Sequence, residues 1–217
     1  MKDIFKRLAG RKPAFANNSS QLVSAVLLPL IKKDEKYHIL FEVRSQDLKR
    51  QPGEICFPGG KVERLDQCDP KAAAVRETAE ELGIRESDIR VAGPLDVMVT
   101  PFGAMIYPFA GEITTRDIRP NPKEVEETFL VPVDFFLNEP PYVTYVDVGT
   151  KYNNDFPLEM VPPVYGGGWQ IRMSYPMYYY HYNKYFIWGM TGIILFNFLS
   201  ICWPESPVFK KPHKTWK

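Results

Sequence analysis

The amino-acid sequence predicts an α/β fold in which a mixed β-sheet lies between layers of helices. Two observations support this fold class. Segments with the apolar pattern of strands are interleaved with segments that have the features of helices. The 217 residues, of which 45% are hydrophobic, are also enough to bury one good core, so a single domain is the simplest organisation.

This domain is expected over residues 21–205, between an N-terminal extension (1–20) and a basic C-terminal tail (206–217). The start of the chain is basic without a long apolar run, which is typical of a short surface helix rather than of a secretory signal. A net charge of +1 gives no indication of a nucleic-acid partner. No paired or metal-like spacing links the three cysteines, so packing roles and a reducing compartment, the cytoplasm, are expected for Cys56, Cys68 and Cys202.

The strands are predicted by apolar runs and alternation. Residues 22–31 form a continuous apolar run typical of a buried strand, and residues 37–44 alternate as a second strand. Residues 89–99 and 105–113 predict two more strands, separated by a turn. Residues 138–183 are rich in Pro, Tyr and Gly and predict a hairpin with long loops. For the tyrosines near its end, packing is the favoured role and a substrate wall is the alternative.

The best-defined helix begins after Asp69, a good N-cap, with Pro70 at the first helical position and Gly83 at the C-cap. Its buried stripe is expected to hold Val75, Ala79 and Leu82. Three glutamates lie on the opposite side of the predicted helix: Glu77, Glu80 and Glu81.

Two further helices are expected, over residues 125–137 and 186–199. The apolar stretch 186–203 contains Asn197 and two glycines and is short for a membrane-spanning helix. A buried helix is therefore the better interpretation, and no membrane partner is expected.

The glutamates of the first helix indicate a metal site. Glu77 and Glu81 are four residues apart, so their like charges cost a few tenths of a kcal/mol unless a cation neutralises them. Ligands that are all oxygen favour hard cations such as Mg²⁺ or Mn²⁺. The alternative is a solvated acidic face, but the preceding glycine pair and Arg76 favour a metal site that handles phosphates.

The stretch from Gly60 to Ile84 resembles the Nudix box, G-x5-E-x7-R-E-U-x-E-E-x-G-U, where U is bulky and aliphatic. Its second half matches from Arg76 onward, and only Thr78 departs. In the first half, Asp66 stands where the box has Glu, and the gap to Arg76 is two residues longer. Glu63 is therefore an alternative partner for Arg76.

A second resemblance narrows the family to the coenzyme A pyrophosphatases. Residues 40–60 are similar to the segment that precedes the box in that subfamily, L-L-x-x-R-S-x3-R-x3-G-x3-F-P-G-G, with Lys49 in place of an arginine. Residues 121–132 and 187–195 resemble two later segments of the subfamily, although Ile193 stands where the family often has arginine. The resemblance covers roughly residues 23–200.

The resemblance implies a Nudix-type α/β/α sandwich with a mixed β-sheet. It also implies metal-dependent hydrolysis of the diphosphate bond of coenzyme A or acyl-CoA, giving 3′,5′-ADP and (acyl-)4′-phosphopantetheine. Glu77 and Glu81 would be metal ligands, with Glu80 as a third ligand or as the base that orients water. Arg76 would complete this catalytic set by pinning the glycine loop.

The resemblance also implies roles outside the helix. Gly59 and Gly60 would let the backbone approach the metal and the diphosphate. Glu124 is a candidate general base, with Glu126 and Glu127 as equal rivals by composition. Contact with the phosphates of coenzyme A is implied for three basic residues: Arg44, Lys49 and Arg50.

Two alternatives remain open at this point. One is a Nudix diphosphatase that acts on ADP-ribose, a dinucleotide or a nucleotide. The other is a non-catalytic ligand-binding domain, against which the survival of all three glutamates argues. A homodimer is compatible with the sequence.

Overall fold

The structure is a computed structural model of the chain that describes residue 9 and residues 23–101, 103–165 and 168–210. The predicted N-terminal extension and its surface helix, apart from residue 9, lie outside the described residues. Residues 211–217 of the predicted basic tail also lie outside them.

The centre of the fold is an eight-stranded mixed sheet. Its main path has the order β3-β2-β1-β7-β5, while β4 also pairs with β1, β6 with β7 and β8 with β2. Strands β1 and β7 run parallel, and the other pairs are antiparallel. The strands are β1 (Val23–Lys33), β2 (Lys36–Arg44), β3 (Ile55–Cys56), β4 (Gly59–Lys61), β5 (Ile89–Pro94), β6 (Met98–Val99), β7 (Met105–Ile113) and β8 (Val125–Pro132).

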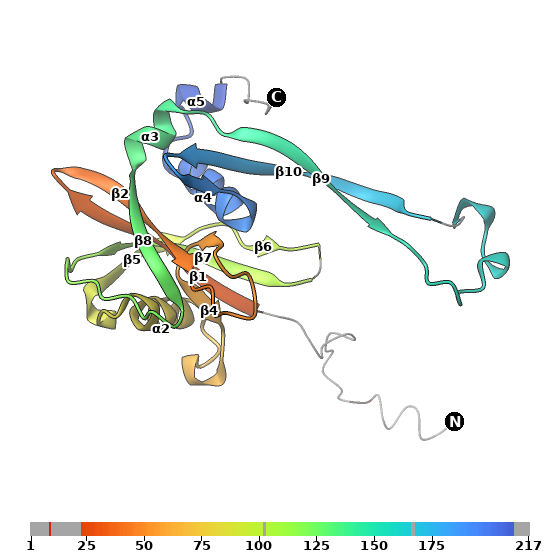
Figure 1. The fold of residues 1–217 in the computed structure, drawn as a ribbon, viewed down its shortest axis with the longest axis horizontal. Helices are drawn as coiled ribbons and strands as arrows, with labels where there is room; N and C mark the ends of the chain where they lie inside the picture. Colours follow the sequence, from red (N-terminus) through yellow and green to blue (C-terminus); the bar gives the residue numbers. More distant parts are fainter. Residues whose placement is uncertain (1–8, 10–22, 102, 166–167, 211–217) are drawn as a thin grey trace.

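Helices cover both faces of this sheet (Figure 1). Helix α2 (Pro70–Leu82) covers one face, and α3 (Val133–Asn138) and α4 (Gly189–Cys202) lie on the other. Strand β2 shows why both faces are covered: Ile39 and Phe41 join the cluster that contains α4 residues, whereas Leu40 packs with Leu82 of α2. The predicted α/β/α sandwich with a mixed sheet is therefore confirmed.

A second, three-stranded sheet has the order β11-β10-β9 and forms a long ribbon that extends away from the body (Figure 1). Its strands are β9 (Tyr142–Thr150), β10 (Gln170–Tyr182) and β11 (Tyr185–Ile187). The hairpin predicted within residues 138–183 is thus present. At its base, Tyr180 packs edge-on against Phe136, and Tyr178 stacks on Phe196, so these rings have the packing role that was favoured.

One predicted helix is wrong over most of its length. Residues 125–132 form strand β8 rather than a helix, and only α3 after Pro132 is helical. The reason is that Phe129 and Val131 are buried at the period of a strand and pair with β2 in the central sheet. The final predicted helix also begins later, at Gly189, because residues 185–187 form β11.

Helix α4 is buried, as expected, through a face that includes Ile194, Leu195 and Phe198. Among the described helices, none has both the length and the apolar character that crossing a bilayer requires. A short helix, α5 (Pro207–Lys210), follows, and four 3-10 helices lie at Arg64–Asp66, Glu86–Asp88, Leu158–Met160 and Pro163–Tyr165.

The predicted buried stripe of α2 needs correction. Ala79 and Leu82 are buried as expected, but Val75 is only half-buried, and the buried face also includes Ala74, Thr78 and Glu81. These three residues follow the four- and three-residue spacing of one helix face. The Thr78 hydroxyl donates to the Ala74 carbonyl at 2.7 Å, which satisfies it in an otherwise apolar position.

Packing roles were also expected for the cysteines. Cys56 is half-buried, but Cys68 and Cys202 are exposed, so the expectation is wrong for those two.

Candidate active site

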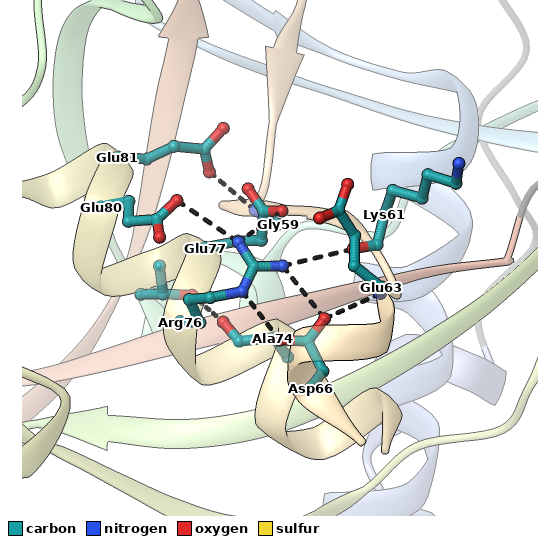
Figure 2. Close-up of polar contacts among 10 residues, drawn as sticks. Gly59, Lys61, Glu63, Asp66, Ala74, Arg76, Glu77, Glu80 and Glu81 are labelled. Atoms are coloured by element: carbon teal, nitrogen blue, oxygen red, sulfur yellow. Dashed lines mark hydrogen bonds and ion pairs between the residues drawn. The ribbon is translucent and has the colours of Figure 1, made fainter. Parts of the chain in front are cut away.

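The glycine strand and the acidic helix lie against each other: Gly59 is beside Glu81 (Figure 2), and Gly60 is beside Glu77. Gly59 and Gly60 belong to β4 and pair with Val26 and Ala25 of β1. A Cβ atom on Gly59 would overlap the β1 backbone, and one on Gly60 would overlap the carboxylate of Glu77. Position 59 therefore requires glycine for the close approach of two strands, whereas a side chain at position 60 would displace the Glu77 carboxylate.

Arg76 joins helix α2 to the glycine strand and to the loop that follows it. Its Nε and Nη2 donate to the two carboxylate oxygens of Asp66 at 2.7 and 3.1 Å, and Nη2 also donates to the Lys61 carbonyl of β4 at 3.3 Å. Asp66, rather than Glu63, is thus the partner of Arg76, while the Glu63 N–H donates to Asp66 Oδ2. The 3-10 turn Arg64–Asp66, which lies just before the longer gap, places Asp66 against the arginine.

Glu77 and Glu80 gather around the same guanidinium. Nη1 of Arg76 lies 2.9 Å from Glu77 Oε1 and 3.3 Å from Glu80 Oε2. Glu80 is on the solvent side, with its side chain 58% exposed. Glu77 is more enclosed, and burial raises the pKa of its carboxyl.

Glu81 points inward, contrary to the expectation that it shares an outer face with Glu77 and Glu80. Its side chain is buried and accepts a hydrogen bond from the Gly59 N–H at 2.7 Å. Burial is the main cause that raises the pKa of the Glu81 carboxyl, and the charge of Glu42 raises it further.

Glu42 is the residue that sequence reasoning missed. It lies on β2 and is 1% exposed. Oε1 accepts from the Cys56 thiol at 3.2 Å, while Oε2 is buried without a hydrogen-bond partner among the described residues. Burial raises the pKa of this carboxyl too. A signal was available, because Glu42 stands between apolar residues in a strand that is covered on both faces.

Glu124 is also close to these carboxylates. Its charge contributes to the raised pKa of Glu42, Glu77 and Glu81. Its two rivals are engaged elsewhere: Glu126 accepts from Gln46, and Glu127 pairs with Lys184. Glu124 is therefore near enough for its charge to act on the acidic cluster, whereas Glu126 and Glu127 contact other residues.

The donor set fits a hard divalent cation. The described residues contain no group of three His, Cys, Asp or Glu side chains already placed to hold an ion, and Arg76 engages Glu77 and Glu80. Even so, Glu81 and Glu42 are buried carboxyls, the charge of Glu42 raises the pKa of Glu81, and one Glu42 oxygen has no partner within the described structure. An added positive charge would relieve this repulsion, and all the available donors are oxygens.

The predicted phosphate-binding residues are separated by the fold. Arg44 lines a cavity of about 600 Å³ that is also lined by Gly59, and its Nε is buried without a hydrogen-bond partner among the described residues. Lys49 and Arg50 are exposed on the loop and are not part of this lining. Only Arg44 of the three thus faces a space beside the acidic cluster.

Known proteins that are similar to this chain identify its family. A model of the NUDIX domain family matches residues 21–145, more than half of the chain. The peroxisomal coenzyme A diphosphatase NUDT7 of Mus musculus is 35% identical over 190 residues, covering 86% of this chain and 72% of that protein. The peroxisomal coenzyme A diphosphatase ndx-8 of Caenorhabditis elegans is 34% identical over 139 residues, covering 61% of this chain and 57% of that protein.

A solved structure, an Ap4A hydrolase binary complex from C. elegans, is similar with a TM-score of 0.43 and 18% identity, over 51% of this chain and 80% of that one. The family match contains the central strands, the glycine pair and the whole acidic helix. Because this match spans more than half of the residues, the chain belongs to the Nudix hydrolase family.

Proposed function

We propose that this Nudix diphosphatase hydrolyses the diphosphate bond of coenzyme A or acyl-CoA, releasing 3′,5′-ADP and (acyl-)4′-phosphopantetheine. One observation carries the proposal: Gly59 binds the Glu81 carboxylate and at the same time lines the cavity that Arg44 enters. A carboxylate cluster for diphosphate chemistry thus adjoins a space large enough for a substrate arm. The names of the mouse and nematode relatives support the choice of substrate.

In this proposal Glu77 and Glu81 hold Mg²⁺ or Mn²⁺, with Glu80 as the candidate third ligand. The cation, when bound, would neutralise diphosphate charge and make water more acidic. The buried Glu42 adds negative charge beside Glu81, which favours a cation there.

The remaining residues position the glycine strand and the substrate and activate the attacking water. Arg76 and Asp66 hold the glycine strand in place, so the Gly59–Gly60 backbone can approach the diphosphate. Arg44, which lines the cavity beside Gly59, offers its guanidinium charge to the phosphate oxygens of the substrate. Glu124 accepts the proton of the attacking water as general base, because it is the acidic residue of its segment that lies near the cluster.

The test is to incubate the purified protein with coenzyme A and Mg²⁺ or Mn²⁺ and to measure 3′,5′-ADP. We expect cleavage that is lost in EDTA and reduced at least a hundredfold by Glu81→Gln, because that substitution removes a charged ligand. Glu86→Gln is the matched control: Glu86 is an exposed glutamate just after α2, and its substitution leaves the rate unchanged.

Two results would contradict the proposal. An unchanged rate in Glu81→Gln would refute the ligand assignment. Faster cleavage of ADP-ribose, a dinucleotide or a nucleotide than of any CoA species would identify a different substrate for the same site.

A further inference from the structure

The cavity beside Gly59 has walls of two chemical kinds. The segment before the glycine pair contributes its polar groups, including Arg44, Gln51 and Glu54. Strand β10 and helix α4 contribute apolar side chains, including Met177 and Ile194. A volume of about 600 Å³ is within the range of small-molecule sites, which combine mostly apolar walls with a few polar groups.

We propose that this cavity binds the acyl-pantetheine arm of the substrate and selects acyl groups by their length. The inference rests on the proposed function, since it assigns a binding site to the part of coenzyme A on the pantetheine side of the scissile diphosphate. Arg44 holds the phosphate end of the arm, and the thioester and acyl chain lie against the walls from β10 and α4.

The apolar wall suits a chain of variable length. Met177 and Met190 are unbranched, polarizable side chains that adapt to the shape of a ligand. Ile194 is 3% exposed and belongs to the main core, so its part of the wall is firm. An acyl chain that reaches Ile194 has no further apolar space, so this residue sets an upper limit on the length of the acyl chain.

The wall is held in place before any substrate arrives. The Thr191 hydroxyl of α4 donates to the Ile55 carbonyl at 3.0 Å, which ties the helix to the polar segment. Gly192 lies so close to β10 that a Cβ atom there would overlap the Tyr178 carbonyl. The first contact fixes the separation of the two walls, and the second fixes α4 against β10 within the apolar wall, so binding does not have to order them.

The apolar wall of the arm site lies outside the matched family region. Residues 21–145 match the NUDIX model, whereas β10 and α4 come later in the chain. The shared domain therefore supplies the hydrolytic residues, and the later segment supplies the selectivity for the arm.

The first measurement is kcat/KM for coenzyme A and a series of straight-chain acyl-CoA substrates. We expect it to rise about fourfold for each methylene that enters the cavity and to fall once the cavity is full. Met177→Trp fills the cavity and should lower the ratio of octanoyl-CoA to coenzyme A cleavage at least tenfold. Met177→Ala enlarges the cavity and should move the optimum to longer chains.

Met173→Trp is the matched control. Met173 is on the same strand, four residues away, but it is 51% exposed and is not part of the cavity lining. This substitution should leave the chain-length profile unchanged. Thermal unfolding of each variant shows that it is folded, and Met177→Ala provides a second reading if the tryptophan is not accommodated.

A binding measurement separates this inference from the proposed function. S-octanoyl-pantetheine, which has no phosphate, is titrated calorimetrically into the metal-free protein, and weaker binding to Met177→Trp than to Met173→Trp supports the arm site. Met177-dependent binding without cleavage of any CoA would overturn the proposed function alone. Cleavage of CoA with no chain-length preference and no effect of Met177 would overturn the arm site alone.

Discussion

Asp66 connects the acidic helix to the glycine strand through one arginine. Its carboxylate accepts two hydrogen bonds from Arg76, which also donates to the Lys61 carbonyl. The Asp66 side chain is 1% exposed, so the pair is shielded from water. The hydrogen bond from Arg76 is the main cause that lowers the pKa of Asp66. Removing this carboxylate leaves a largely buried guanidinium without its main partner.

We expect Asp66→Asn to lower the free energy of unfolding by about 3 kcal/mol at neutral pH, the size found when one partner of a buried pair is removed. The folded pKa of Asp66 is lower than the unfolded value. Its stabilisation is therefore present above the unfolded pKa of about 4 and is lost as the pH falls through the folded pKa. Urea unfolding at neutral pH and below about pH 4 measures both effects.

Asp117→Asn is the control for this prediction. Asp117 makes the same two-bond contact with Arg119, but its side chain is 69% exposed. Exposed pairs of this kind contribute about 0–1 kcal/mol. Equal losses in the two variants would show that burial of the Asp66 pair is not what stabilises the loop.

At the same scale, the sequence predicts that three carboxylates share helix α2, but not how deeply each is buried or that Glu42 lies beside Glu81. The spacing in α2 places Glu77, Glu80 and Glu81 on one helix, as found. It does not reveal that Glu81 faces inward, because that depends on where β4 lies against the helix. Glu42 and Asp66 are placed by strand pairing and by a 3-10 turn, which are tertiary and local features that periodicity does not encode.

At the scale of elements, the packing of α4 on β10 depends on one small residue. Gly192 faces the Tyr178 carbonyl, which is part of the β10 backbone and cannot rotate away as a side chain would. An added methyl group at this position must therefore move the helix or the strand.

We expect Gly192→Ala to lower the free energy of unfolding by about 1–3 kcal/mol, the usual cost of overpacking. Chemical denaturation measures this loss. Gly93→Ala is the matched control, because a Cβ atom at Gly93 of β5 meets nothing within 4 Å. A loss no larger than that of Gly93→Ala would contradict the close packing of α4 on β10.

Element types were predicted best where local signals agree. For α2, the N-cap, the first-turn proline and the C-cap glycine all indicate the same helix, and the observed bounds follow them. Residues 125–132 carry no such caps, and their apolar residues suit either a helix or a strand. Pairing with β2 decides in favour of the strand, and this pairing is a long-range contact that the local sequence does not show.

At the scale of the molecule, the body and the ribbon have different roles. The main cluster of buried residues joins the central sheet to α3, α4 and the base of the ribbon through Tyr180 and Ile187. The ribbon extends away from this body (Figure 1) and exposes Tyr145, Trp169 and Ile171. The sequence predicted a hairpin here, but its projection depends on how far β9 and β10 continue beyond the core.

The body should therefore fold and act without the outer part of the ribbon, residues 148–173. We expect a variant in which Asn-Gly replaces residues 148–173 to unfold within a few degrees of the full chain, because the turn then joins the paired residues Asp147 and Ser174. It keeps Tyr175 and Met177 in the cavity wall, so its chain-length profile should be unchanged. Calorimetry and the acyl-CoA series measure the two properties, and size-exclusion chromatography with light scattering compares the mass of the particles. A folded variant that no longer cleaves coenzyme A would show that the outer ribbon completes the site. If light scattering also shows that this variant has lost one subunit, the ribbon completes the site of a second copy of the chain.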